Sequence, residues 1–251
     1  MFIDDKAERL RGEDAVLVDD VVASLGKLYA RVYAQDNMIV TGRSVAFQHE
    51  PEFARAFAAV ADNPHAHRLM WRMHTLAWAA RNAMAVGGDF VECGVFRAFK
   101  SAFLMDLLRF DQTDRHFWLY DTFAGVPAAQ RGPDTISSAG HQVPGIADQV
   151  RARFAHQPRV HVVEGMVPDV LVDGAPERVG FLHLDMNSAI AELGALEFFW
   201  DRMVPGGTVV LDDYGWSAFR PQLEAADGFF HARGYTVLEL PTGQGMVTRR
   251  P

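Results

Sequence analysis

The sequence predicts an α/β fold built around a mostly parallel sheet. From residue 87 onward, short apolar strands alternate with helical stretches, and the strands at 181–184 and 208–211 are nearly continuous apolar runs. Such runs are typical of parallel strands, because helices cover both faces of a parallel sheet. Only a short turn separates the last two strands, 235–240 and 245–249, so this closing pair should be antiparallel.

The expected elements of this region follow in a regular order. Strands are expected at 90–94, 116–120, 160–163, 181–184, 208–211, 235–240 and 245–249, and helices at 100–110, 147–154, 193–203 and 220–233. Together they predict a domain over 86–251 with a seven-stranded sheet. A stretch rich in Gly, Pro and Ser, 128–146, falls over the strand ends, where it is expected to form a lid.

Residues 1–85 are expected to form a helical extension of this domain. Apolar side chains in its first half recur at three- and four-residue steps, the period of one helix face: Val21, Leu25, Leu28 and Val32. After a break at 62–64, a second amphipathic helix is expected over 67–84. The apolar positions of both helices are interpreted as core.

The composition is that of an ordinary globular chain of 251 residues with a net charge of −8, and it contains no Lys/Arg-rich tract. Nucleic acids and anionic membranes are therefore not expected as partners. No run of about 18 uncharged apolar residues is present, so no membrane span is expected. A single cysteine, Cys93, and acids where a signal peptide would be basic favour the cytoplasm.

Three acidic residues end two of the expected strands. Asp185 follows the strand at 181–184, and Asp212 and Asp213 follow the strand at 208–211. Like charges at such close range would favour proton uptake unless a cation compensates them. A hard divalent cation would do so, and it could also activate a substrate hydroxyl. The sequence therefore predicts a metal site here, with a plain turn or helix cap at 212–213 as the alternative.

Polar groups also mark the ends of the first three strands. Glu92 and Gly94 lie where the first strand meets a helix, Asp121 ends the second strand, and Glu164 and Gly165 end the third. Open α/β sheets bind ligands at this edge, and a carboxylate at the second strand end is the usual acceptor for ribose hydroxyls. The first loop lacks two glycines of the dinucleotide fingerprint, which favours a nucleoside with an amino-acid tail over a pyrophosphate. Glu92 is expected to bind the ammonium group of that tail.

These motifs resemble the macrocin O-methyltransferase family. The resemblance lies in 88–95 (GDFVECGV), 120–127 (YDTFAGVP) and 204–214 (VPGGTVVLDDY), with upstream support from 36–43 and 71–74. The family consists of enzymes that use S-adenosylmethionine to methylate sugar hydroxyls of macrolides and related glycosides. The resemblance implies a Rossmann-like class I methyltransferase domain with an antiparallel last strand, and a homodimer formed through the N-terminal helices.

The resemblance also implies the site. Magnesium is expected at Asp185, Asp212 and Asp213. The residues expected to bind S-adenosylmethionine are Glu92, Gly94, Lys100, Ser101, Asp121, Thr122, Phe123, Glu164, Gly165 and Asp185.

The general base stays open at this point. The family has a second acid two residues after the first metal acid, where this chain has Asn187, which cannot accept a proton at neutral pH. The candidates are His141, which lies in the lid, and Glu192, with His74 as a weaker third. Asn187 is expected to hydrogen-bond an acceptor hydroxyl.

The leading interpretation is magnesium-assisted O-methylation of a sugar hydroxyl on a glycoside, oligosaccharide or polysaccharide. The Ala, Arg and Val content is typical of a GC-rich bacterium, which makes a mycobacterial methylmannose polysaccharide one candidate acceptor. One alternative is a catechol-type enzyme acting on aromatic diols, which typically carries a lysine where this chain has Asn187 and Ser188. The others are a nucleotide-binding oxidoreductase and a non-catalytic subunit that binds S-adenosylmethionine.

Overall fold

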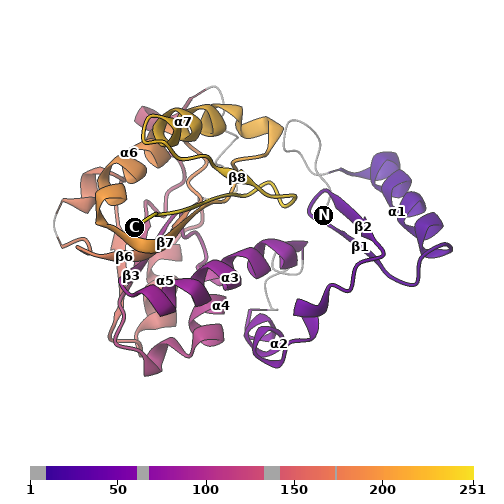
Figure 1. The fold of residues 1–251 in the computed structure, drawn as a ribbon, viewed down its shortest axis with the longest axis horizontal. Helices are drawn as coiled ribbons and strands as arrows, with labels where there is room; N and C mark the ends of the chain where they lie inside the picture. Colours follow the sequence, from indigo (N-terminus) through magenta and orange to yellow (C-terminus); the bar gives the residue numbers. More distant parts are fainter. Residues whose placement is uncertain (1–9, 61–67, 133–141, 173) are drawn as a thin grey trace.

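The computed structural model describes residues 10–60, 68–132, 142–172 and 174–251. Within these residues, a seven-stranded sheet forms the centre of the molecule, and helices cover both of its faces (Figure 1). A separate two-stranded hairpin and a helix form an arm at one end (Figure 1). None of the described helices combines the length and apolarity that crossing a membrane requires.

The strands of the large sheet lie in the order β5-β4-β3-β6-β7-β9-β8. They are β3 (Asp89–Cys93), β4 (Phe117–Asp121), β5 (Val160–Glu164), β6 (Val179–Leu184), β7 (Met203–Leu211), β8 (Leu238–Glu239) and β9 (Gly245–Thr248). β3 to β7 pair in parallel, whereas β9 pairs antiparallel with both β7 and β8. The predicted α/β class with an antiparallel last strand is therefore confirmed.

Two hydrophobic cores fill the space between the sheet and its helices. The helices are α3 (Met70–Val86), α4 (Phe99–Leu108) and α5 (Ile146–Phe154) on one face, and α6 (Ala189–Phe199) and α7 (Arg220–His231) on the other (Figure 1). Neighbouring residues of one strand serve opposite cores, as Phe90 and Val91 do in β3. This alternation explains the continuous apolar runs, because both faces of each central strand are buried.

The N-terminal part is only partly helical, which corrects the expectation for residues 1–85. The helix α1 (Gly12–Gly26) ends before Val32, and two strands follow it, β1 (Val32–Gln35) and β2 (Met38–Thr41). Asp36 and Asn37 connect these strands in a two-residue turn, and both have a φ of 54°. Asn and Asp tolerate this left-handed conformation better than most residues, so the pair favours a hairpin.

Two further details differ from the sequence expectation. Helix α6 begins at Ala189, four residues earlier than expected, because the hydroxyl of Ser188 accepts a hydrogen bond from the amide of Ala191 and caps the helix. No residue of α1 is buried, so its apolar side chains are not part of the core. A short helix, α2 (Pro51–Ala58), contributes Phe53 and Phe57 to the core instead.

Candidate active site

The candidate site lies at the carboxyl ends of β3, β4, β6 and β7. The chain order reverses here, since β4 and β5 extend the sheet on one side of β3 while β6 and β7 extend it on the other. Open α/β sheets bind their ligands at such switch points. The amides of Asp185 and Asp212 continue the strand hydrogen bonding, to the carbonyls of Cys93 and Leu184. The backbone positions of these two acids are therefore set by the hydrogen bonding of the sheet.

The three predicted acids do come together. Asp185, Asp212 and Asp213 each offer a carboxylate oxygen, and these oxygens lie within 4.8 Å of one another. Asp212 and Asp213 are buried, and Asp185 is partly exposed. Burial and the charge of Asp185 raise the pKa of Asp213 to about 7. The three carboxylates lie close together because the parallel strands β6 and β7 end at the same edge of the sheet.

Two cationic side chains reach into this acid cluster from the helices. The ammonium of Lys100, on the first turn of α4, lies 2.6 Å from Oδ2 of Asp185 and 2.7 Å from Oδ2 of Asp212. The guanidinium of Arg72, on α3, lies 2.7 Å from Oδ2 of Asp212 and 3.5 Å from Oδ1 of Asp213. The sequence resemblance predicts that Lys100 binds the cofactor. In the structure its ammonium instead forms ion pairs with Asp185 and Asp212.

Arg72 also connects the acid cluster to the N-terminal hairpin. Its Nε donates to Oδ2 of Asp36 at 2.7 Å, and both side chains are buried. Apart from the likeness of 36–43 and 71–74 to one family, no sequence pattern indicates this contact. The helical extension expected over 1–85 does not include the hairpin turn that presents Asp36.

Asp212 is the most fully bonded of the three acids. Its Oδ2 accepts from Lys100 and Arg72, and its Oδ1 accepts from Gln244 at 2.9 Å and contacts Nε2 of His183 at 3.3 Å. Burial alone would raise the pKa of Asp212, but Lys100 and Arg72 hold that pKa well below its ordinary value. Four partners match the number of acceptor positions on a carboxylate, about four.

Glu92 lies beneath this cluster and not on an open surface. Its Oε1 pairs with Nδ1 of His183 at 3.0 Å, and its Oε2 accepts from the hydroxyl of Ser101. Burial would lower the pKa of His183, but its hydrogen bonds to Asp212 and Glu92 raise it to about 9. Ser101 therefore positions Glu92, and Glu92 positions His183 beside Asp212. The sequence predicts cofactor contacts for Glu92 and Ser101, whereas the structure shows these contacts within the protein.

Asp121 fixes the loop after β3. Its Oδ2 accepts from the amides of Val95 and Phe96 at 2.6 and 2.7 Å, and its Oδ1 accepts from the amide of Phe123 at 2.6 Å. These bonds leave about one of its four acceptor positions for a ligand. The hydroxyl of Thr122 donates to the carbonyl of Gly125 and closes the adjoining turn.

Gly94 and Gly165 lie where the chain approaches neighbouring atoms too closely for a side chain. Gly94 has a φ of 90°, and a Cβ there would lie 1.9 Å from the carbonyl oxygen of Asp185. A Cβ at Gly165 would lie 2.1 Å from the side chain of Val170. Glu164, its neighbour, forms an exposed ion pair with Arg151 at 2.6 Å. Both glycines are thus needed to bring strand ends and loops together.

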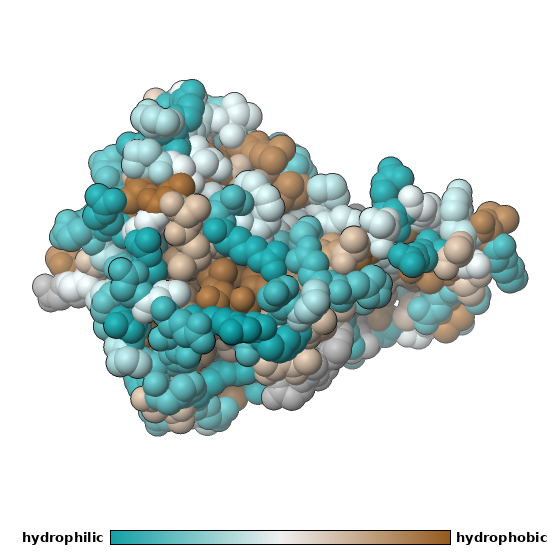
Figure 2. All heavy atoms as spheres, turned by 60° about the horizontal axis from the view of Figure 1, so that its bottom comes forward, coloured by the Kyte–Doolittle hydropathy of each residue, from teal (hydrophilic) through white to brown (hydrophobic). Residues whose placement is uncertain are grey.

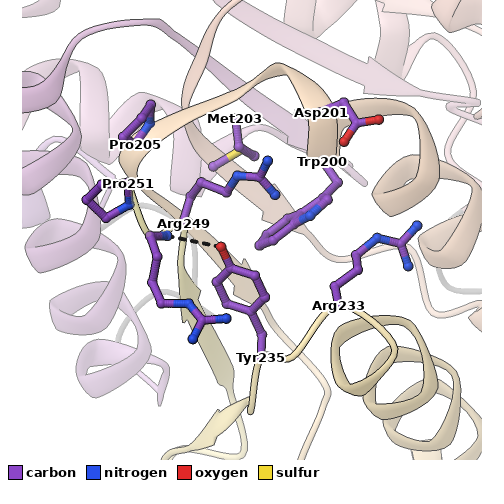
Figure 3. A pocket seen from close by; sticks show the side chains of 9 residues that line it. Trp200, Asp201, Met203, Pro205, Arg233, Tyr235, Arg249 and Pro251 are labelled. Atoms are coloured by element: carbon purple, nitrogen blue, oxygen red, sulfur yellow. Dashed lines mark hydrogen bonds between the residues drawn. The ribbon is translucent and has the colours of Figure 1, made fainter.

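An open groove of about 690 Å³ lies at the other end of β7 (Figure 3). It is lined by Trp200, Asp201, Met203, Pro205, Arg233, Tyr235, Arg249, Arg250 and Pro251. Met203 begins β7 and Asp212 follows its last residue, so the groove and the acid cluster lie at opposite ends of one strand. We do not include the groove in the candidate site.

Comparison with known proteins identifies the family. Residues 12–237 match the family described as macrocin-O-methyltransferase (TylF). This chain belongs to the TylF family.

Two curated relatives of this TylF-family chain are O-methyltransferases by name, and the name of the first contains a rhamnosyl sugar. It is 30% identical over 162 residues to an 8-demethyl-8-(2,3-dimethoxy-alpha-L-rhamnosyl)-tetracenomycin-C 4'-O-methyltransferase of Streptomyces olivaceus, covering 59% of this chain and 62% of that protein. It is 27% identical over 160 residues to a mycinamicin III 3''-O-methyltransferase of Micromonospora griseorubida, covering 58% of this chain and 63% of that protein. The matches thus span about three fifths of the relatives' length.

A solved structure shows the same fold. The O-methyltransferase NovP aligns with 94% of this TylF-family chain and 99% of its own, with a TM-score of 0.65 and 19% identity. At this identity the likeness concerns the fold alone.

The candidates for the general base differ in their surroundings. His141 lies outside the described residues, as does the part of the expected lid over 133–141. Glu192 is buried, and burial together with the charges of Asp213 and Asp185 raises its pKa well above the ordinary value. His74 stacks on the core residue Phe47, with ring centroids 4.1 Å apart, and its ring also packs against Phe53. Asn187 lies two residues after Asp185 with a φ of 53° and is half-buried.

The buried position of Arg72 leads to a prediction about stability. Replacing Arg72 by Ala should lower the free energy of unfolding by about 3–5 kcal/mol, because Asp36 and Asp212 would be left as buried charges with a partner missing. Replacing Arg55 by Ala is the matched control, since its ion pair with Asp106 is exposed and contributes about 1 kcal/mol or less. Urea denaturation measures both, and equal losses would contradict the assignment.

Proposed function

We propose that the chain transfers the methyl group of S-adenosylmethionine to a hydroxyl group of a sugar. The observation that carries the proposal is the family match over residues 12–237, which includes every strand end of the candidate site. The names of both relatives describe O-methylation, and that of the first describes a rhamnosylated compound. The activity of the whole protein is part of the proposal, since the matches span about three fifths of those relatives.

The methyl donor would bind at the ends of β3, β4 and β5. S-adenosylmethionine supplies a methyl group on a sulfonium, so the protein's main task is to align the acceptor oxygen with it. Asp121 suits a ribose hydroxyl, because it holds the loop after β3 and keeps about one acceptor position free. Glu164 and Gly165, in register with the end of β4, would lie near the adenine. Glu92 and Ser101 would not contact the donor, because they hydrogen-bond to each other and Glu92 pairs with His183.

The acceptor would bind beside β6 and β7. Asn187 is half-buried at the end of β6 and can donate to or accept from a sugar hydroxyl. The magnesium ion that the sequence predicts is not part of this mechanism. The carboxylates have the right chemistry for it, but Lys100 and Arg72 already engage them, and Asp212 has no acceptor position to spare among its described partners.

A binding and turnover assay tests the proposal. Calorimetry should show that the protein binds S-adenosylhomocysteine, and methyl transfer from S-adenosylmethionine should be detected with at least one acceptor from a panel of rhamnosides, macrolide glycosides and mannose oligosaccharides. The mannose compounds test the polysaccharide acceptor that the sequence suggested. Methylation of catechols alone would favour the aromatic-diol alternative, and binding of a nicotinamide cofactor would refute the proposal. Binding without transfer to any acceptor would indicate a non-catalytic subunit.

A substitution at Asn187 separates acceptor binding from proton transfer. Asn187→Ala should raise KM for the sugar about two- to tenfold, the effect of one lost hydrogen bond worth about 0.5–1.5 kcal/mol. Asn187→Asp should keep activity, because a carboxylate can still accept from the hydroxyl. Asn82→Ala on the exposed side of α3 is the control and should change neither constant. An inactive Asp variant would refute this role.

A homodimer remains part of the proposal, with α1 as its contact. The helix leaves Val16 57% and Leu17 64% exposed, and Figure 2 shows hydrophobic side chains at the far end of the arm. Sedimentation should give twice the chain mass for the wild type and a smaller mass for Leu17→Glu. Val172→Glu is the control, because Val172 is also exposed, to 76%, but lies on the sheet domain. A monomeric wild type would exclude the dimer.

A further inference from the structure

We infer that the ammonium group of Lys100 takes the place of a divalent metal ion in the acid cluster, so that the site is compensated by the chain itself. The inference concerns charge compensation among Asp185, Asp212 and Asp213. It does not depend on the proposed methyl transfer, because its first test is metal binding.

The position of Lys100 is the first argument. Its Nζ lies 2.6 Å from Asp185 and 2.7 Å from Asp212, at the distances of charge-assisted hydrogen bonds. A magnesium ion bound to the same two oxygens, at about 2.1 Å from each, would compete for the space that the ammonium fills. It would also face a fixed positive charge at contact range.

The anchoring of Lys100 is the second argument. The residue lies in the first turn of α4, directly after the loop whose amides Asp121 holds. Its side chain is 7% exposed, so it cannot move into solvent without rearrangement of that loop. The ammonium is therefore part of the folded structure and not a surface charge that a metal ion could displace at low cost.

The bonding of Asp212 is the third argument. Gln244 and His183 contact Oδ1, while Lys100 and Arg72 contact Oδ2. A metal ion could bind Asp212 only by breaking one of these contacts, and each partner is buried. A buried donor that loses its acceptor costs about 1–3 kcal/mol, and a charged one costs more.

The charge count is the fourth argument. Arg72 divides its charge among Asp36, Asp212 and Asp213, whereas the ammonium of Lys100 contacts only Asp185 and Asp212. Without Lys100, Asp185 would lose its cationic partner and the cluster would gain one uncompensated negative charge, which favours binding of a cation. Removal of Lys100 should therefore create the metal site that the sequence pattern of acids predicts.

The test is a Mn²⁺ titration followed by electron paramagnetic resonance, with Mn²⁺ as the probe for a magnesium site. Lys100→Met keeps an unbranched side chain, one atom shorter, and removes the charge, and Lys27→Met, at the exposed end of α1, is the matched control. The wild type and Lys27→Met should show no saturable site at micromolar Mn²⁺. Lys100→Met should bind one ion at least about tenfold more tightly, and Lys100→Met combined with Asp213→Asn should lose this gain.

Two results of this titration would decide against the inference or limit the test. Saturable micromolar binding by the wild type, with no gain in Lys100→Met, would overturn the inference. If Lys100→Met fails to fold by circular dichroism, the wild-type titration decides alone. Tight stoichiometric binding then refutes the inference, and lack of saturation supports it.

A second readout uses turnover. Once an acceptor is found, the wild-type rate should stay within about twofold when EDTA replaces magnesium, because the compensating charge is covalently attached. A rate that EDTA abolishes and magnesium restores would overturn the inference. If no acceptor is found, the proposed function fails while the Mn²⁺ titration still decides the role of Lys100.

Discussion

The rest of the structure depends on the pairing of one buried carboxylate, that of Asp212. Transferring a carboxylate from water to a protein interior costs several kcal/mol unless charged and polar partners compensate it. Here the partners come from separate elements: Arg72 from α3, Lys100 from α4, His183 from β6 and Gln244 from the turn before β9. Each of these elements must therefore be in place before the end of β7 can be buried, which couples the site to the assembly of the sheet and its helices.

The same pairing fixes the N-terminal arm to the sheet domain. The hairpin touches the site through Asp36, whose carboxylate shares the guanidinium of Arg72 with Asp212, and through Tyr33, whose hydroxyl accepts from the amide of Trp71. Burial raises the pKa of Asp36, although Arg72 opposes the effect. Arg72 thus joins the hairpin and the acid cluster in one buried ion-pair network.

The sequence predicted the sheet well and the site in part. Apolar runs identify buried parallel strands from local information, and parallel strands bring their ends together, so Asp185, Asp212 and Asp213 could be grouped without a structure. Spacing along the chain does not reveal which distant side chain reaches a given acid. Arg72 meets Asp212 from 140 residues away, and no local pattern reveals such a contact. The hairpin turn at Asp36 and the helix cap at Ser188 differ from the helical N-terminal region and the later helix start that the sequence predicts. Without the hairpin turn, the contact between Asp36 and Arg72 cannot be predicted.

Two features of the site have a common electrostatic explanation. The family pattern has a second acid where this chain has Asn187, and this chain places the ammonium of Lys100 between Asp185 and Asp212. A carboxylate at position 187 would add negative charge close to Asp185, where burial and the neighbouring carboxylates already raise the pKa values of Glu192 and Asp213. The neutral side chain of Asn187 avoids this charge, which matters in a buried cluster because the repulsion between like charges grows as the local dielectric falls. The amide at position 187 and the ammonium at position 100 therefore both limit the negative charge that the cluster carries.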